Sequence, residues 1–193
     1  ICTASGITAK TLAGKITAAY CTSDSQSILD DPAINTVLIG TRHDSHAALT
    51  IKALLAGKHV FVEKPLCLTE DELKDIRSVY EKTAPDGLQL MVGFNRRFSP
   101  HAQEAGKFFA SRVNPLVMLY RINAGRIPAD HWVQHPDIGG GRLIGEMCHF
   151  VDYMQALSAS SPTSVYASRI GRHSSGITDD QCSIVVIFAD GSI

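Results

Sequence analysis

The stretch at residues 57–65 constrains the fold most, because an apolar run of strand character ends there in three residues of special chemistry. Residues 59–62 form the run, and Glu63, Lys64 and Pro65 follow it. In a parallel α/β sheet, ligands bind just beyond the carboxyl ends of the strands, so a carboxylate and an ammonium delivered there are placed for chemistry. Pro65 fixes its own φ and favours an extended Lys64, which holds the lysine in one direction. The alternative is a surface charge pair followed by a proline that begins a loop.

Three continuous apolar runs in the first half of the chain have the composition of buried parallel strands. They lie at residues 37–41, 59–62 and 88–94. Segments of helical composition separate them, so the order is strand, helix, strand, helix, strand. Connections of this kind predict a parallel sheet with helices on its faces.

Capping residues mark where the two intervening helices begin. Asp44 or Ser45 can cap the first helix, which stops before Gly57. Thr69 and Glu72 have the spacing of a capping box for the second helix.

The pattern changes after residue 97. The second half is expected to contain two helices, a strand-like run between them, and two strands that alternate like those of an antiparallel sheet. These segments are residues 101–111 and 143–157 (helices), 116–124 (strand-like), and 164–170 and 182–188 (alternating strands).

A chain of 193 residues can form one large domain or two small ones. The change of pattern places a boundary near residue 98. We therefore expect a parallel α/β domain at residues 1–98 and an α+β domain with a largely antiparallel, open sheet at residues 99–193. Residues 1–3 have the character of a strand end, and residues 190–193 that of a hairpin turn with the start of a strand. From these ends we expect a fragment of a longer polypeptide.

The composition is that of an ordinary globular protein, with 45% hydrophobic and 19% charged residues. A net charge of −1 gives no reason to expect nucleic acid or a membrane surface as a partner. No apolar stretch approaches membrane-spanning length. The five cysteines are scattered, odd in number and without a Cys-x-x-Cys pair, which favours a reducing, cytoplasmic setting over disulfides or a zinc ribbon.

The helix predicted at residues 143–157 divides into two faces. Leucine, methionine, phenylalanine and valine side chains form an apolar stripe, and Glu146, His149, Asp152 and Tyr153 lie on the other side. A histidine flanked by carboxylates is a means of building a proton-transfer group with a pKa near neutrality. The alternative, favoured for this helix by itself, is a polar face that meets water.

The segment between the first strand and its helix contains Thr41, Arg42, His43 and His46. Free N–H groups at such a junction suit anionic or polar ligands. Two histidines three residues apart could hold a metal, but no cysteine or carboxylate lies at ligand spacing. A loop that contacts a cofactor is favoured, and no metal is expected.

Two further segments contain candidate binding residues. After the third strand, Asn95 offers an amide contact, and Arg96 or Arg97 can bind an anion or a structural carboxylate. Trp132, the only tryptophan, lies in a loop with histidines, which suits contact with a sugar. An anchor in a small satellite core is the favoured alternative for Trp132.

Taken together, four motifs resemble the Gfo/Idh/MocA family of oxidoreductases. They are Thr41-x-x-x-x-His46, Ala56-Gly57-Lys58-His59-Val60-Phe61-Val62-Glu63-Lys64-Pro65, Val92-Gly93-Phe94-Asn95-Arg96-Arg97, and Gly139-Gly140-Gly141 with His149-x-x-Asp152. The match runs in order along the whole chain. The segments 41–43 and 142–152 are more similar to the version found in two-part proteins, in which an alcohol-dehydrogenase-like region precedes the Gfo/Idh/MocA portion.

The resemblance implies a Rossmann domain followed by a domain with an open sheet, which often supports homo-oligomers in relatives. It implies NAD or NADP as cofactor and hydride transfer between nicotinamide and a carbon of a sugar, cyclitol or related substrate. The family's lysine carries over onto Lys64, near the nicotinamide and the substrate hydroxyl, and its histidine onto His149, as acid/base or substrate orienter.

The resemblance also implies the roles of the surrounding residues. Thr41, Glu63 and His46 match positions near the dinucleotide, and Asn95 and Arg96 match positions that close the site. Arg42 and His43 lie in the same cofactor loop. For the substrate, the expected contacts are Lys64, Trp132, Glu146, His149 and Asp152.

Two departures from the family are evident. Many relatives have an aspartate four residues before the histidine, where this chain has Gly145; the neighbouring Glu146 points about 100° away on an α-helix. The glycine-rich phosphate loop and the first Rossmann strand are absent, and residues 3–5 contain no acid to bind a ribose 2′-hydroxyl, so NAD versus NADP stays open.

A missing mid-sheet strand would leave backbone groups unpaired in the core. We therefore expect that the strand was cleaved off, lies outside the chain described, or is replaced by pairing with another copy. The alternative function is a ligand-sensing or regulatory module on the same fold, since fold does not fix function. The oxidoreductase hypothesis depends on one geometric expectation, that Lys64 and His149 converge between the two domains.

Overall fold

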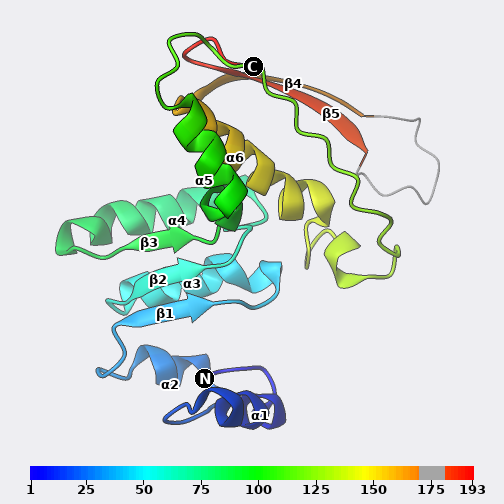
Figure 1. Cartoon of the computed structure of the whole chain (residues 1–193). Coiled ribbons are helices and arrows are strands. Elements are labelled where there is room, and N and C mark those ends of the chain that lie inside the picture. The colour runs from blue at the N-terminus through cyan, green and yellow to red at the C-terminus, as the bar shows by residue number, and fades with distance from the viewer. Residues whose placement is uncertain (170–180) are drawn as a thin grey trace.

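The computed structural model describes residues 1–169 and 181–193. Figure 1 shows a parallel sheet with its helices in the lower half and a helical layer under an antiparallel hairpin in the upper half. In the described residues, no helix has both the length and the apolar character needed to cross a membrane.

The lower half is built on a three-stranded sheet in the order β1-β2-β3. The strands are β1 (Thr36–Ile39), β2 (His59–Val62) and β3 (Leu90–Val92), and both neighbouring pairs are parallel. The helices between them are α3 (His46–Leu55) and α4 (Glu70–Thr83), the latter followed by the short turn η2 (Ala84–Asp86). The predicted alternation and the parallel sheet are both confirmed.

The core of the lower half lies between this sheet and its helices. Val62, Leu54 and Val60 are at most 3% exposed, and Leu29 and Ile39 belong to the same cluster. Burying a side chain of this size contributes about 1.5–3 kcal/mol. Apolar strand residues and the inner faces of α2 and α3 therefore fix the sheet, whose carboxyl edge presents the loops that follow β1, β2 and β3.

The two intervening helices begin differently. The Thr69 Oγ1 accepts a hydrogen bond from the Glu72 N–H at 3.2 Å, and Glu72 Oε2 accepts from the Thr69 N–H at 3.1 Å. The predicted capping box is thus confirmed. At α3 the cap residue is Ser45, but its side chain makes no capping bond. A 3₁₀ turn, η1 (His43–Ser45), precedes the helix, and the Ser45 hydroxyl instead donates to the Arg42 carbonyl at 2.8 Å.

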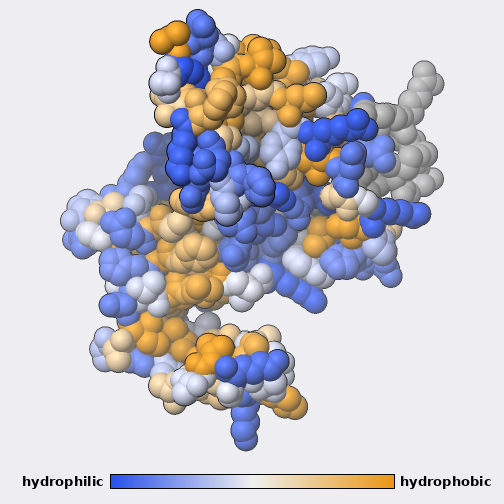
Figure 2. Space-filling view, viewed as in Figure 1, coloured by the Kyte–Doolittle hydropathy of each residue, from blue (hydrophilic) through white to orange (hydrophobic). Residues whose placement is uncertain are grey.

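The first residues form a unit beside the sheet. It contains α1 (Gly6–Ile16), α2 (Ser25–Leu29) and a parallel bridge between Cys2 and Thr22. Within the described residues, β1 pairs only with β2, and Leu38 on β1 is 73% exposed. Figure 2 shows hydrophobic surface both on the α1 unit and on the sheet beside it.

The upper half contains α5 (Pro100–Phe109), α6 (Cys148–Ser158), β4 (Pro162–Arg169) and β5 (Cys182–Phe188). β4 and β5 pair antiparallel, so the antiparallel sheet expected in this half is confirmed in the residues described. Ile170, which the sequence analysis assigned to the first of these strands, lies outside them.

The strand predicted at residues 116–124 is wrong, because this segment has no assigned strand. Its side chains do alternate, with Val117 and Leu119 88% and 95% exposed. The Met118 N–H donates to the Ile193 carbonyl, and the Ile193 N–H donates to the Leu116 carbonyl, at 2.8 and 2.9 Å. Two backbone bonds to a single residue are too few to establish a strand.

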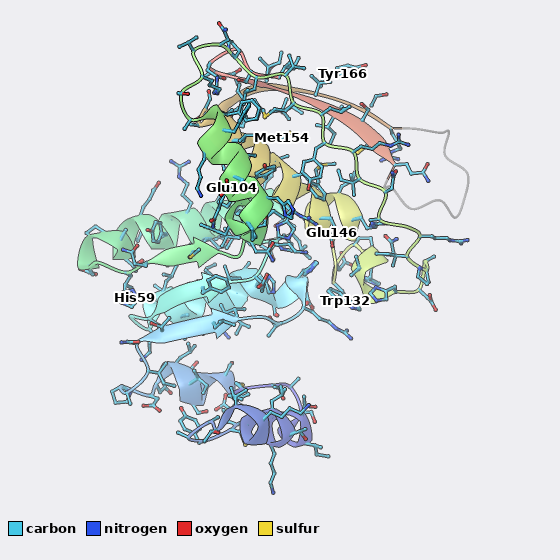
Figure 3. All side chains as sticks on the ribbon, in the orientation of Figure 1. His59, Glu104, Trp132, Glu146, Met154 and Tyr166 are labelled. Atoms are coloured by element: carbon cyan, nitrogen blue, oxygen red, sulfur yellow. The ribbon has the colours of Figure 1, made fainter. Side chains whose placement is uncertain are left out.

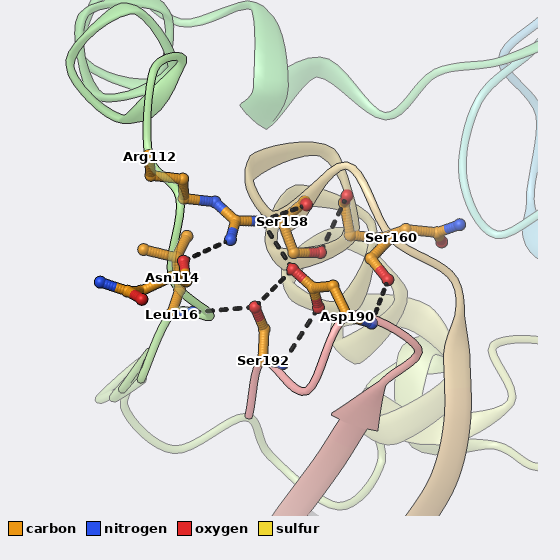
Figure 4. A network of polar contacts seen from close by, with 8 residues as sticks. Arg112, Asn114, Leu116, Ser158, Ser160, Asp190 and Ser192 are labelled. Carbon is orange, nitrogen blue, oxygen red and sulfur yellow. Dashed lines mark hydrogen bonds and ion pairs between the residues drawn. The ribbon is translucent and has the colours of Figure 1, made fainter.

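An ion pair between Arg112 and Asp190 joins the segment after α5 to the turn after β5 (Figure 4). Arg112 Nη2 donates to Asp190 Oδ2 at 2.7 Å and to the Ser158 carbonyl at the end of α6. Asp190 also accepts from the N–H and hydroxyl of Ser192, at 3.0 and 2.8 Å. The hydrogen bond from Arg112, followed by that from the Ser192 N–H, lowers the pKa of Asp190 to about 2.

This pKa predicts how stability depends on pH. Because the folded-state pKa is depressed, the stabilisation is complete above the ordinary carboxyl pKa of about 3.9 and is lost as pH falls toward 2. Replacing Arg112 by Met should lower the midpoint of urea unfolding at pH 7 and flatten its decline between pH 4 and pH 2. Lys107→Met, which removes only an exposed pair with Glu104, should leave both unchanged. An identical acid dependence in wild type and Arg112→Met would contradict the assignment.

Candidate functional site

The loops after β1, β2 and β3 meet at the carboxyl edge of the sheet, on the side toward which all three arrows point in Figure 1. Two elements of the upper half reach this edge. One is the helical segment formed by the π-helical turn η5 (Leu143–Met147) and α6, which also packs against η3 (Asn95–Phe98). The other is the loop that carries Trp132. Figure 3 places Glu146 and Trp132 on this same side of the molecule.

Lys64 is the group that connects the sheet edge to the helix. Its Nζ donates to the carbonyl oxygen of Gly145 at 2.9 Å and lies 3.6 Å from Glu146 Oε1. The Lys64 side chain is 18% exposed, so most of it is shielded from solvent. The Lys64–Pro65 peptide bond is cis. The structure thus brings Lys64 to the turn that precedes His149, while the predicted joint action of Lys64 and His149 stays a prediction.

His149 lies on the first turn of α6 and is 5% exposed. Its ring meets that of Phe94 edge-on at 6.2 Å, and its Nδ1 has no hydrogen-bond partner within the described residues. Burial lowers the pKa of His149 most, and the positive charges of Lys64 and Arg96 lower it further, against the opposing charges of Glu146 and Glu63. The imidazole is therefore neutral at pH 7 and able to accept a proton.

The two histidines of the first loop support the backbone of the site. His46 is fully buried, with Nδ1 2.7 Å from the Pro65 carbonyl and Nε2 3.1 Å from the Thr41 carbonyl. It therefore links the loop after β1 to the loop that carries Lys64. Carbonyl oxygens already face both ring nitrogens of His46, so its ring holds the two loops together. A contact of His46 with the dinucleotide stays a prediction.

His43 links the same loop to the upper half. Its Nδ1 lies 2.8 Å from the Gly139 carbonyl, and burial lowers its pKa. In the part of the chain that the structure describes, no group of three or more His, Cys, Asp or Glu side chains is arranged to hold a metal ion.

Trp132 begins the short turn η4 (Trp132–Gln134) and packs on the loop after β1. Its ring lies 4.9 Å from that of His43, and the Arg42 guanidinium stands over it at 5.6 Å. Trp132 is half-buried. The geometry therefore gives it the role of an anchor between the two halves, which the sequence analysis favoured, while contact with a substrate stays a prediction.

Asp152 is held by Arg97. The Arg97 Nε donates to Asp152 Oδ2 at 2.8 Å, and Nη2 contacts the other carboxylate oxygen. Asp152 is 9% exposed, and the hydrogen bond with it raises the pKa of Arg97. The sequence analysis gave two possible partners for these arginines, an anion or a structural carboxylate. Arg97 binds a structural carboxylate, that of Asp152. A further contact of Asp152 with substrate stays a prediction.

Three other predicted residues lie at the same edge. Arg96 stacks on the ring of Phe150, 4.7 Å from its centroid. Asn95 is exposed and, with Arg96, lines a cavity of about 490 Å³. The Thr41 hydroxyl lies 2.6 Å from that of Ser45, at the end of β1.

Two glycines that the sequence analysis did not assign a role make the close contacts possible. A Cβ at Gly93 would lie 3.0 Å from Glu63 Oε2, and one at Gly145 would lie 3.1 Å from His43 Cε1. A glycine at the end of a strand often marks such a close approach, so Gly93 carried a usable signal. Gly145 gave no comparable signal, because its neighbour His43 is about a hundred residues away in the sequence.

A large cavity in the upper half does not contain this centre. It has a volume of about 750 Å³ and lies between the apolar face of α6, residues 117–124 and β5. Of the charged centre, only Glu146 lines it. We place the candidate site by its chemistry instead, because an ammonium, a neutral imidazole and a carboxylate converge at the carboxyl edge of the sheet, where such folds bind ligands.

Comparisons with known proteins identify the family. Residues 1–94 match the family described as "Oxidoreductase family, NAD-binding Rossmann fold" (GFO_IDH_MocA). The scyllo-inositol 2-dehydrogenase (NAD(+)) of Bacillus subtilis is 33% identical over 145 residues, which cover 74% of this chain and 40% of that protein.

Solved structures resemble the whole described fold. An oxidoreductase domain protein from Kribbella flavida superposes with a TM-score of 0.84 at 27% identity, covering 99% of this chain and 55% of the other. Levoglucosan dehydrogenase in complex with NADH and levoglucosan superposes with a TM-score of 0.78 at 27% identity, covering 100% and 55%.

The chain spans about half the length of these solved structures, and 40–42% of the first two curated relatives. The Rossmann-type parallel sheet, the motifs along it and the relatives agree with one another. The chain belongs to the Gfo/Idh/MocA family of oxidoreductases.

Proposed function

We propose that this chain provides the catalytic centre of an NAD(P)-dependent dehydrogenase that acts on a sugar, a cyclitol or a related hydroxyl or carbonyl compound. The observation that carries the proposal is the convergence of Lys64 with the helix of His149 at the carboxyl edge of a parallel sheet. The relatives support the substrate class, since their names include inositol and levoglucosan dehydrogenases.

The residues proposed to bind a nicotinamide dinucleotide follow β2 and β3. The Glu63 carboxylate lies close to the backbone of Gly93, and Asn95 and Arg96 follow Gly93 in the chain. NAD or NADP, when bound, would supply the hydride acceptor or donor. Thr41 and Arg42 lie at the end of the neighbouring strand, where the cofactor loop was predicted.

The chain's own residues then handle the proton. When a substrate hydroxyl is oxidised, its carbon loses a hydride and its oxygen loses a proton. The ammonium of Lys64 stabilises the negative charge that develops on this oxygen, and the neutral His149 accepts the proton. When a carbonyl is reduced, a protonated His149 returns the proton to the oxygen, and the ammonium of Lys64 again stabilises the negative charge that develops there. The lowered pKa of His149 keeps it in the accepting form at neutral pH.

Two further expectations concern the whole protein. Relatives with an open second sheet often form homo-oligomers, and we propose the same here. We also propose a cytoplasmic location, which the five unpaired cysteines support.

The proposed activity has a direct test. Oxidation of inositols and sugars by the full-length protein should raise the absorbance of reduced nicotinamide at 340 nm with NAD or NADP. No absorbance change with either cofactor across the substrate panel would favour the ligand-sensing alternative.

Lys64→Met should lower kcat/KM at least about a hundredfold, the usual scale for loss of a group that stabilises charge or transfers a proton. Lys74→Met, on the exposed face of α4, is the matched control and should leave kcat/KM unchanged. Near-normal turnover by Lys64→Met would refute the role given to this lysine.

His46→Asn should lower kcat about tenfold or more, because the loops that present Thr41 and Lys64 would lose their link. The KM for the dinucleotide should change less than kcat if His46 acts by holding Lys64. His59→Asn, at the amino end of β2, controls for a general effect on the sheet. A folded His46→Asn protein with wild-type kcat would show that the link is dispensable.

A further inference from the structure

A π-helical turn interrupts the helix that carries His149 near its start. Residues Leu143–Met147 form a π-helical turn, η5, and α6 continues from Cys148 without a break. A π-turn holds one residue more than an α-turn and is rare; it occurs mostly as a single turn inside an α-helix, frequently at functional sites. Here it lies directly before the proposed proton acceptor, and it contains both groups that Lys64 contacts.

The lack of space around Gly145 explains why the carboxylate of this turn comes from Glu146 and not from residue 145. A Cβ at Gly145 would lie 3.1 Å from His43 Cε1, 3.5 Å from His43 Nδ1 and 3.6 Å from the Gly139 carbonyl. His43 is held in place by its own bond to Gly139. Any side chain at position 145 would therefore press on a fixed ring, and only the backbone of Gly145 is available to Lys64.

Glu146 supplies a carboxylate at the same place. Its Oε1 lies 3.6 Å from Lys64 Nζ, while Lys64 also donates to the Gly145 carbonyl. Lys64 is thus held by two neighbouring residues of one turn. An ordinary surface pair exposes both partners, whereas here the lysine side chain is 18% exposed and the glutamate 42%.

The surroundings of His149 give Glu146 a second effect. Four charged groups act on the imidazole, namely Lys64 and Arg96, which lower its pKa, and Glu146 and Glu63, which raise it. The ring of Phe94 packs against it from the sheet side. Glu146 therefore opposes the two positive charges that make it harder for His149 to take up a proton.

We propose that the π-turn serves to present Glu146 to the Lys64–His149 centre. Its carboxylate, 3.6 Å from the Lys64 ammonium and three residues before His149 on the same helix, positions Lys64 and counterbalances the positive charge around His149. Glu146 is in this view a positioning residue that acts through Lys64 and His149. The catalytic part of the proposal rests on the proposed dehydrogenase function, whereas the electrostatic part does not.

The electrostatic part is tested on the protein without turnover, by an NMR titration of ¹³C-labelled histidine, with His149→Gln used to assign the signal. Glu146→Gln should move the midpoint of His149 to lower pH, and Glu146→Asp should restore it in part. Glu70→Gln, on the exposed first turn of α4, should leave the midpoint unchanged. An unchanged midpoint in folded Glu146→Gln would overturn the proposal.

The role of the π-turn itself is tested by deleting Ile144, which removes one residue and returns the turn to an α-helical register. If the turn presents Glu146, this deletion should shift the His149 midpoint as Glu146→Gln does, although the glutamate is retained. A folded deletion variant with the wild-type midpoint would show that the π-turn is not what places Glu146. Should the deletion variant fail to fold, the Glu146→Gln titration still decides the electrostatic part.

The catalytic part is tested in the active full-length protein. Glu146→Gln should lower kcat about tenfold with little change in the KM for the substrate, and should move the pH profile of kcat in the same direction as the NMR midpoint. An unchanged kcat would remove Glu146 from catalysis. Absence of turnover in the wild type would instead reject the proposed function and leave the NMR result standing by itself.

Discussion

The contact between the Lys64 ammonium and the Gly145 carbonyl is the interaction on which the arrangement of the candidate site depends. It joins residues 81 positions apart and connects the edge of the parallel sheet to the helix of the upper half. A lysine that follows a strand points at whatever lies beyond the sheet, so the identity of its partner decides its chemistry. Here the partner is a turn that contains a carboxylate and precedes a buried imidazole, so this contact gathers the three groups of the proposed proton-transfer centre.

The remaining contacts between the two halves keep that geometry fixed. His46 ties the loop after β1 to the loop of Lys64, His43 ties it to Gly139, and Trp132 packs on it from the upper half. These contacts use backbone carbonyls and ring packing, which do not depend on long, flexible side chains. A site built between two layers needs such links, because a displacement of about 1 Å can reduce a rate a hundredfold.

The sequence predicts features that depend on neighbouring residues, and it fails for features that depend on contacts between distant residues. β1, β2, β3 and the capping box of α4 are determined by neighbouring residues, and all were predicted. The failure at residues 116–124 has a long-range cause, since alternation makes a strand only where another strand pairs with it, and here Ile193 alone does so. The π-turn was also missed. An α-helical wheel places Glu146 about 100° from Gly145, and only the packing of His43 against Gly145 shows why the carboxylate comes from the next residue.

Some charged side chains are fully paired with a partner and others are not. The incompletely paired ones are those that remain available for chemistry. Arg97 and Asp152 satisfy one another, Arg112 and Asp190 close a turn, and the buried Lys58 donates to the Asp31 and Ile34 carbonyls. At the sheet edge, by contrast, Lys64 and Glu146 stand 3.6 Å apart and partly exposed, and His149 retains a buried nitrogen without a partner in the described residues. A buried polar atom left unsatisfied costs about 1–3 kcal/mol. Among the residues that the structure describes, Thr50 and Gln134 also have such an atom, but only at His149 does it lie beside a partly exposed ion pair, and this combination supports the sheet edge as the proposed site of reaction.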